Sequence, residues 1–324
     1  MAQPKTLIAG GAGYLGQTLA KILIDSGRKV TVLDNLLFGP QPELQKLDLT
    51  FVQGDIRDIG LVRATLEGHQ EAILLAALVG EPLCDQRPKE ALEVNYLAAL
   101  NFAQTAKALR VNRFIFASTD SCYGQREKEI LTELSPLAPI SLYARLKAES
   151  ETAILKLGSS LNFHPTILRM ATIYGLAPRP RFDLAINLLA REATLSGAVK
   201  IFSGEQWRPL VHVKDAAKAY LLALKAPLEL VSREIFNVGS NEQNIQFKDL
   251  AALLAQTFPA AKVEITPEPP DLRDYYVDFY KIKKVLGFTP EFTPKDAFIE
   301  IKNAILGGLI LEPRSKRYQN VGGL

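Results

Sequence analysis

The 324-residue sequence has few of the residues that build disulfide frameworks and metal sites. Its two cysteines, Cys84 and Cys122, are too few for a disulfide framework, which favours a reducing compartment. Its three histidines stand singly and form no metal-ligand spacing with the cysteines. We therefore expect neither stabilising disulfides nor a bound metal.

The sequence also lacks a strong charge bias and long apolar runs. A net charge of +3 gives no reason to expect nucleic-acid binding. The longest apolar run, residues 72–80, is strand-length and falls short of the roughly 18 to 20 residues of a membrane helix. No secretory-signal pattern precedes the first apolar strand. We expect a cytoplasmic protein with no membrane and no nucleic-acid partner.

What the first half of the chain does contain is a regular alternation of apolar runs and helical patterns. Five runs are apolar along their whole length, and helical spacing appears between the first two and between the last two of them. Strands of this kind separated by helices are typical of a parallel sheet covered on both faces, so the fold class is α/β and doubly wound. The predicted strands are residues 6–9, 29–33, 49–53, 72–76 and 113–117, with helices at 15–26 and 89–109.

The second half is less regular. After a predicted helix at 143–157 and a strand at 163–169, the pattern loosens from Gly175 onward. We expect a sheet domain of residues 1–170 and 206–238 and a smaller C-terminal lobe of residues 171–205 and 239–324. The further predicted elements are helices at 182–196, 248–257 and 295–306 and a late strand at 234–238.

A glycine triplet connects the first predicted strand to the first helix. Gly10, Gly13 and Gly16 have the spacing of a turn that lets backbone approach a pyrophosphate at a helix N-terminus. Asp34 ends the second strand, where a carboxylate can bind the adenosine ribose. No Arg or Lys follows at residues 35–37 to receive a 2′-phosphate. The pattern predicts a Rossmann-like site for NAD rather than NADP.

A second motif lies further along the chain. Tyr143 and Lys147 are four residues apart, so a helix places both on one face. An ammonium beside the phenol would lower its pKa and make Tyr143 a general base. Thr119 follows the fifth strand, at the edge of the sheet where ligands bind, and its hydroxyl could bind a substrate hydroxyl.

Together these motifs resemble the extended short-chain dehydrogenase/reductases, in particular the NAD-dependent NDP-sugar epimerase/dehydratase family. The resemblance covers nearly the whole chain and includes GGAGYLG, GDIRD, STDSCYG, YARLK and WRPLVHVKD. It implies a Rossmann-like domain with a substrate-binding lobe, a sugar oxidised transiently by NAD, and a homodimer formed through a four-helix bundle.

The resemblance also implies roles for individual residues. Tyr143, Lys147, Thr119 and Asp120 would be catalytic. The cofactor would be bound by Gly10, Gly13, Tyr14, Leu15, Gly16, Asp34, Asn35, Asp55, Ile56, Ala76, Ala77, Asn95, Tyr143 and Lys147. The substrate would be bound by Thr119, Ser121, Cys122, Asn187, Arg208 and Arg273.

One departure from the family bears on the reaction. The 4,6-dehydratases carry Asp and then Glu after the catalytic Thr, whereas here Asp120 is followed by Ser121. A serine is not a carboxylate base, so an epimerase acting most simply at C4 is the leading hypothesis. The alternatives are a dehydratase that uses Asp120 with another base, and a non-catalytic NAD-binding sensor. Cys122 is either such a base, as a thiolate, or a small buried filler.

Overall fold

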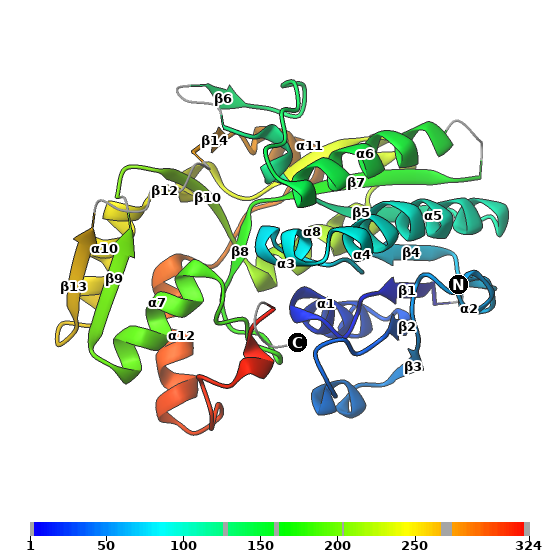
Figure 1. Cartoon of the computed structure of the whole chain (residues 1–324). Coiled ribbons are helices and arrows are strands. Elements are labelled where there is room, and N and C mark those ends of the chain that lie inside the picture. Colours follow the sequence, from blue (N-terminus) through cyan, green and yellow to red (C-terminus); the bar gives the residue numbers. More distant parts are fainter. Residues whose placement is uncertain (1–2, 126–128, 159–161, 203, 267–273, 321–324) are drawn as a thin grey trace.

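The computed structural model describes residues 3–125, 129–158, 162–202, 204–266 and 274–320. Its centre is a seven-stranded parallel sheet in the order β11-β7-β5-β4-β1-β2-β3 (Figure 1). This order winds outward in both directions from β1, which confirms the doubly wound, Rossmann-like α/β fold. The strands are β1 (Lys5–Ala9), β2 (Lys29–Asp34), β3 (Leu49–Gln53), β4 (Glu71–Leu74), β5 (Arg113–Thr119), β7 (His164–Met170) and β11 (Ile235–Val238).

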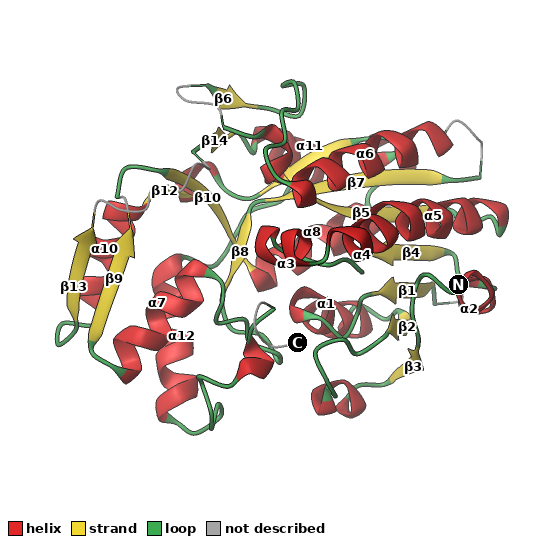
Figure 2. Cartoon of the chain, in the orientation of Figure 1, coloured by secondary structure: helices red, strands yellow, loops and turns green. Residues whose placement is uncertain are grey.

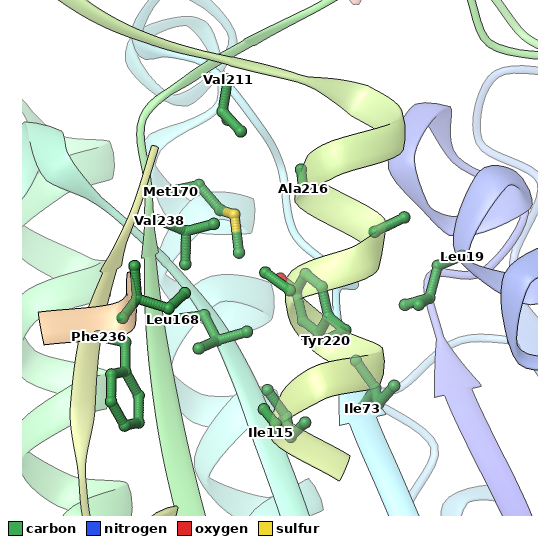
Figure 3. Close-up of a cluster of buried hydrophobic side chains, with 14 of the residues drawn as sticks. Leu19, Ile73, Ile115, Leu168, Met170, Val211, Ala216, Tyr220, Phe236 and Val238 are labelled. Carbon is green, nitrogen blue, oxygen red and sulfur yellow. The ribbon is translucent and has the colours of Figure 1, made fainter. Parts of the chain in front are cut away.

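Helices cover both faces of this sheet because successive strand residues point to opposite sides. In β1, Ile8 packs into one core and its neighbours Leu7 and Ala9 into another. Figure 3 shows the first core, where Tyr220 lies among apolar side chains of the strands and of a second helix. This core is closed by α1 (Tyr14–Asp25), α8 (Val213–Lys225) and α11 (Tyr280–Leu286), and the other by α2 (Ile59–Leu66), α5 (Ala99–Ala108) and α6 (Leu142–Leu157).

The predicted helix at 89–109 contains a change of pitch. It begins as α4 (Pro88–Leu92), continues through a π-helical segment Glu93–Ala98, and ends as α5. Such π segments often occur at functional sites, and this one carries the buried Asn95.

A smaller lobe stands beside the carboxyl edge of the sheet (Figure 2). Its core joins three helices from distant parts of the chain, and its short strands pair in sheets separate from the central one. Strand β10 lies in the segment assigned by sequence to the sheet domain, yet it pairs with β8 and β12. The segments assigned to the lobe contain α7 (Ala185–Leu195), α10 (Phe247–Thr257), α12 (Pro294–Leu306), β8 (Thr172–Tyr174), β9 (Ala198–Phe202), β12 (Asn244–Gln246) and β13 (Lys262–Thr266), and β10 spans Trp207–His212.

The remaining elements are short. They are α3 (Glu81–Gln86), α9 (Leu228–Val231), β6 (Ile130–Leu131) and β14 (Tyr276–Val277). Within the described ranges, no helix has the length and apolar character needed to cross a membrane.

Candidate functional site

A cavity of about 320 Å³ lies at the carboxyl edge of the central sheet. The loops after β1, β2, β4 and β5 and the first turns of α6 form its walls. Sixteen of the residues predicted from sequence line it together: Gly10, Gly13, Tyr14, Leu15, Gly16, Asp34, Asn35, Asp55, Ile56, Ala76, Ala77, Thr119, Asp120, Ser121, Tyr143 and Lys147.

The glycine turn brings bare backbone to this cavity. Gly10 has a φ of +83°, and a Cβ there would lie 2.4 Å from the Ala76 nitrogen, so the fold itself requires glycine. Gly13 differs, because a Cβ would meet only the Gly10 oxygen, at 3.4 Å. Helix α1 begins after Gly13 with neither a capping side chain nor an acidic residue in its first turn. The open helix terminus and the space at Gly13 fit a diphosphate.

Asp34 is fixed at one end of the cavity. Its two carboxylate oxygens accept hydrogen bonds from the backbone N–H groups of Ala12, at 3.0 Å, and Leu36, at 2.8 Å. Burial raises the pKa of Asp34, and these two donors oppose the rise. The carboxylate is thereby held in one orientation, which suits recognition of ribose hydroxyls. Nearby, the Asn35 amide donates to Asp55 at 3.0 Å and shapes the rim.

Tyr143 and Lys147 lie at the other end, one helical turn apart on α6. The Lys147 ammonium donates to the Ala117 carbonyl at 2.9 Å, and burial lowers its pKa to about 8. Burial raises the pKa of Tyr143 above its usual value, contrary to the lowering expected from sequence. The physical reason is desolvation, which penalises the charged form of both groups.

The loop after β5 continues the wall beside Tyr143. The Thr119 hydroxyl oxygen accepts from the Ser121 N–H at 3.2 Å. The buried Asp120 accepts from the Tyr275 hydroxyl at 3.2 Å. A hydroxyl and a carboxylate thus line the same cavity as the predicted base.

Three of the predicted binding residues lie behind the cavity walls. The Cys122 thiol is fully buried and donates to the Ala144 carbonyl at 3.3 Å, and burial raises its pKa to about 12. Asn95 binds both backbone groups of Leu78, at 2.8 and 2.9 Å. Asn187 accepts from the Gly175 N–H at 2.8 Å and donates to the Arg181 carbonyl at 3.0 Å. These three side chains support the surrounding loops and do not line the larger cavity.

Arg208 belongs to a second cavity, of about 290 Å³, inside the lobe. Its guanidinium donates to the Trp207 carbonyl at 2.9 Å and lies 5.6 Å from the centre of the Tyr275 ring. The two cavities share the wall residues Thr172 and Leu184, so they adjoin. Arg273 lies outside the described residues.

Sequence reasoning missed several residues that line the larger cavity. The loop after β8 contributes Arg179 and Arg181, the C-terminal segment contributes Asn320, and the start of α3 contributes Glu81. The available signal was the run Pro178 to Arg181, in which two cations alternate with two prolines after a strand. Its position relative to Asp34 depends on tertiary structure and is not visible in the sequence.

Comparisons with known proteins find relatives over most of the chain. Residues 6–239 match the NAD dependent epimerase/dehydratase family. The UDP-glucose 4-epimerase of Corynebacterium glutamicum is 29% identical over 313 residues, covering 91% of this chain and 94% of that protein. The structure of the Thermotoga maritima UDP-glucose 4-epimerase with UDP-glucose is similar, with a TM-score of 0.84, 26% identity and coverage of 94% and 99%.

A dehydratase is nearly as similar. The structure of the dTDP-glucose 4,6-dehydratase from Streptomyces venezuelae with NAD bound has a TM-score of 0.80 and 27% identity, covering 93% of this chain and 96% of that one. These relatives share one fold while differing in reaction. The glycine turn, Asp34 and the Tyr143–Lys147 pair, together with the match over most of its length, show that the chain belongs to the NAD-dependent epimerase/dehydratase family.

Proposed function

We propose that this protein is an NAD-dependent epimerase of a nucleotide-diphosphate sugar, acting at C4 through a transient keto sugar. One observation carries the proposal: Tyr143, Lys147 and Thr119 line the same cavity as the glycine turn and Asp34. A proton-transfer group and a dinucleotide-binding turn in one cavity are what a hydride-transfer reaction on a sugar hydroxyl requires. The similarity to UDP-glucose 4-epimerases supports it.

The residues present fit the cofactor. Gly10, Gly13 and Gly16 would hold its diphosphate, Asp34 the adenosine ribose, and Lys147 the nicotinamide ribose. When bound, NAD supplies a hydride acceptor and a positively charged ring beside the sugar carbon.

Proton transfer falls to Tyr143. Its phenolate would accept the proton of the sugar hydroxyl, and Thr119 would orient that hydroxyl through its own. Because burial raises the pKa of Tyr143, the phenolate needs a nearby positive charge, which the protonated Lys147 provides. Tyr143 must return the proton when the keto group is reduced, since epimerisation is redox-neutral overall.

The second cavity would take the rest of the substrate. It adjoins the larger cavity at Thr172 and Leu184, and Arg208 lines it. A guanidinium can bind phosphate oxygens in pairs, so Arg208 would hold the nucleotide diphosphate and place the sugar at the junction, beside Tyr143. We propose the same role, binding of the nucleotide diphosphate, for Arg273.

Asp120 supports a second candidate, an NDP-sugar dehydratase, because this carboxylate lines the cavity beside Thr119. The reaction also needs a base where the chain has Ser121. Cys122 is a poor substitute, since its thiol is buried and its pKa is raised to about 12. A pure NAD-binding sensor would have no use for the Tyr143–Lys147 pair.

The test is to incubate the protein with NAD and a panel of nucleotide sugars and to analyse products by mass spectrometry and proton NMR. We expect an isomer of unchanged mass that is absent with Tyr143→Phe. A product lighter by one water would instead establish the dehydratase. Saturable NAD binding without turnover of any sugar in the panel would favour the sensor.

We further propose a cytoplasmic homodimer whose NAD domain comprises residues 1–170 and 206–238 and whose substrate lobe comprises 171–205 and 239–324. Leu92 and Leu97, on the helix that leads into α5, are 43% and 47% exposed, which suits a dimer face. Light scattering after size exclusion should give twice the mass of the chain, and Leu97→Glu should reduce it to the monomer. Fractionation of producing cells should place the protein in the cytoplasm.

A further inference from the structure

Arg179 is a buried cation that lines the larger cavity. It is 4% exposed, and its guanidinium lies 4.3 Å from the centre of the Phe38 ring. One nitrogen, Nη2, donates to the Asn320 side-chain oxygen at 3.1 Å. The Nε donor has no hydrogen-bond partner within the described part of the chain.

The charge of Arg179 is poorly compensated. Within the described ranges no carboxylate forms an ion pair with it, and burial lowers its pKa to about 10. The neighbouring cation Arg181 lowers that pKa further, although Arg181 itself is paired with Asp183 at 2.6 Å. A buried guanidinium with an unused donor is costly unless an anion completes its surroundings.

The loop after β8 lies beside the N-terminus of α1, because the Tyr14 hydroxyl donates to the Gly175 carbonyl at 2.6 Å and Ala177 packs against the Tyr14 side chain. The Arg179 guanidinium lies against Phe38, in the loop that follows Asp34, and so stands at the ribose end of the cavity. Its charge lowers the pKa of Asp34, against the larger effect of burial. The charge of Arg181 acts in the same way on Tyr143, at the reactive end. A dinucleotide that joins these ends carries its diphosphate between them, beneath this loop and beside the N-terminus of α1.

We propose that Arg179 binds the diphosphate of the dinucleotide, as a side-chain contact from the loop after β8 that adds to the backbone donors of the glycine turn. This inference rests on the proposed function, because it takes NAD to be the ligand of the larger cavity. It assigns a cofactor contact that lies far in sequence from the glycine motif.

The C-terminal segment holds this contact in place. Figure 1 shows it in red, returning from α12 toward α1. The Phe182 N–H donates to the Tyr318 carbonyl at 2.8 Å, and the two rings meet edge to face with centres 5.8 Å apart. Asn320 therefore reaches Arg179 from a segment already attached to the same loop. Asn320 is a positioning residue in this arrangement.

The experiment measures binding of NAD, NADP and ADP-ribose by isothermal titration calorimetry to the wild type, Arg179→Gln, Arg179→Lys and Asn320→Ala. Charge-assisted hydrogen bonds predict that Arg179→Gln binds NAD and ADP-ribose about 10- to 100-fold more weakly. Arg179→Lys, which keeps the charge and loses the planar fork, should fall between. Asn320→Ala should cost about threefold, because it loosens the position of the guanidinium and leaves its charge in place.

Arg191→Gln is the matched control. Arg191 is also buried, lies 5.5 Å from the Phe182 ring centre and has an unpartnered Nη1, yet it lines neither cavity. Its variant should bind NAD like the wild type. Melting temperatures check that each variant is folded. If Arg179→Gln does not fold, the test uses Arg179→Lys.

The outcomes separate this inference from the proposed function. A wild type that binds no dinucleotide overturns both. If the wild type binds NAD and the Arg179 variants bind it equally well, only the inference is overturned. Equal weakening by Arg191→Gln would also overturn it, since the effect would be general. A loss confined to NADP would assign Arg179 to a ribose phosphate and overturn the diphosphate contact.

Discussion

The two adjoining cavities are built in different ways. The larger one is formed mainly by backbone turns at the ends of consecutive strands, with glycines where side chains would collide. The smaller one is formed by side chains from β8, α7, β10, β12 and α10, which are brought together only by the lobe. A backbone-built site tolerates little change, whereas a side-chain-built site can change its ligand through single substitutions.

This difference explains how relatives of one fold can act on different nucleotide sugars. The similar structures include a UDP-glucose 4-epimerase and a dTDP-glucose 4,6-dehydratase with NAD. The comparison predicts that a substitution at the larger cavity impairs either the chemical step or the binding of the cofactor. A substitution at the smaller cavity should change only the affinity for the substrate.

The largest effect is expected from Tyr143→Phe. Removing the proton-transfer group should lower kcat about 1000-fold, within the range typical of general acid–base groups. NAD affinity should change less than threefold, because the glycine turn and Asp34 are untouched. Steady-state kinetics and calorimetry measure the two quantities. Near-normal turnover would show that another group moves the proton.

Gly13→Val should have the next largest effect, about 100-fold weaker NAD binding with a nearly unchanged melting temperature. The extended backbone at Gly13 accepts a branched residue, and its Cβ meets only the Gly10 oxygen at 3.4 Å, so the added methyls point into the cavity. Gly10→Ala is the contrast, since its Cβ would collide with Ala76 backbone and lower the melting temperature. Unfolding of both variants would contradict the distinction.

The features that could be predicted from the sequence are mostly those of the backbone-built site. The central strands were recognisable because buried parallel strands carry consecutive apolar residues, as in β5 at Phe114, Ile115 and Phe116. The glycine turn and Asp34 were recognisable because backbone geometry restricts residue choice locally. Helix α8 was not predicted, although residues that it buries, such as Ala216, Tyr220 and Ala223, recur at helical spacing.

Side-chain environments were harder to predict. Arg179 could not be placed beside Asp34, since that proximity depends on the loop after β8 and on the C-terminal segment. The pKa of Tyr143 was misjudged because spacing along a helix reveals a neighbouring ammonium and says nothing of burial, which dominates. Cys122 was open to two interpretations for the same reason.

Arg208→Met tests the smaller cavity. Loss of a guanidinium from the proposed diphosphate contact should raise the KM for the nucleotide sugar about 10- to 100-fold. The affinity for NAD should stay within twofold, because Arg208 does not line the larger cavity. An equal loss of NAD affinity would show that the two cavities are not independent.

Lys147 offers a pH-dependent effect in the NAD-free protein. Its folded pKa of about 8 lies below its unfolded value, so folding opposes its protonation and the wild type gains stability as the pH rises above 8. Relative to Lys147→Met, the melting temperature of the wild type should therefore rise by roughly 2 to 5 °C between pH 7 and pH 10. A constant difference would show that Lys147 does not titrate in this range.

The smallest effect is expected from Cys122→Ser, with turnover unchanged within about twofold, as for a substitution away from the chemistry. The thiol lies behind the wall, and its pKa of about 12 keeps it protonated at neutral pH. It should also react slowly with thiol reagents until the protein unfolds. Ser121 lines the cavity, so Ser121→Ala is the control that shows the effect of removing a side chain from the wall itself. A large loss of activity in Cys122→Ser alone, with a wild-type product lighter by one water, would make the cysteine a base and transfer the reaction to the dehydratase.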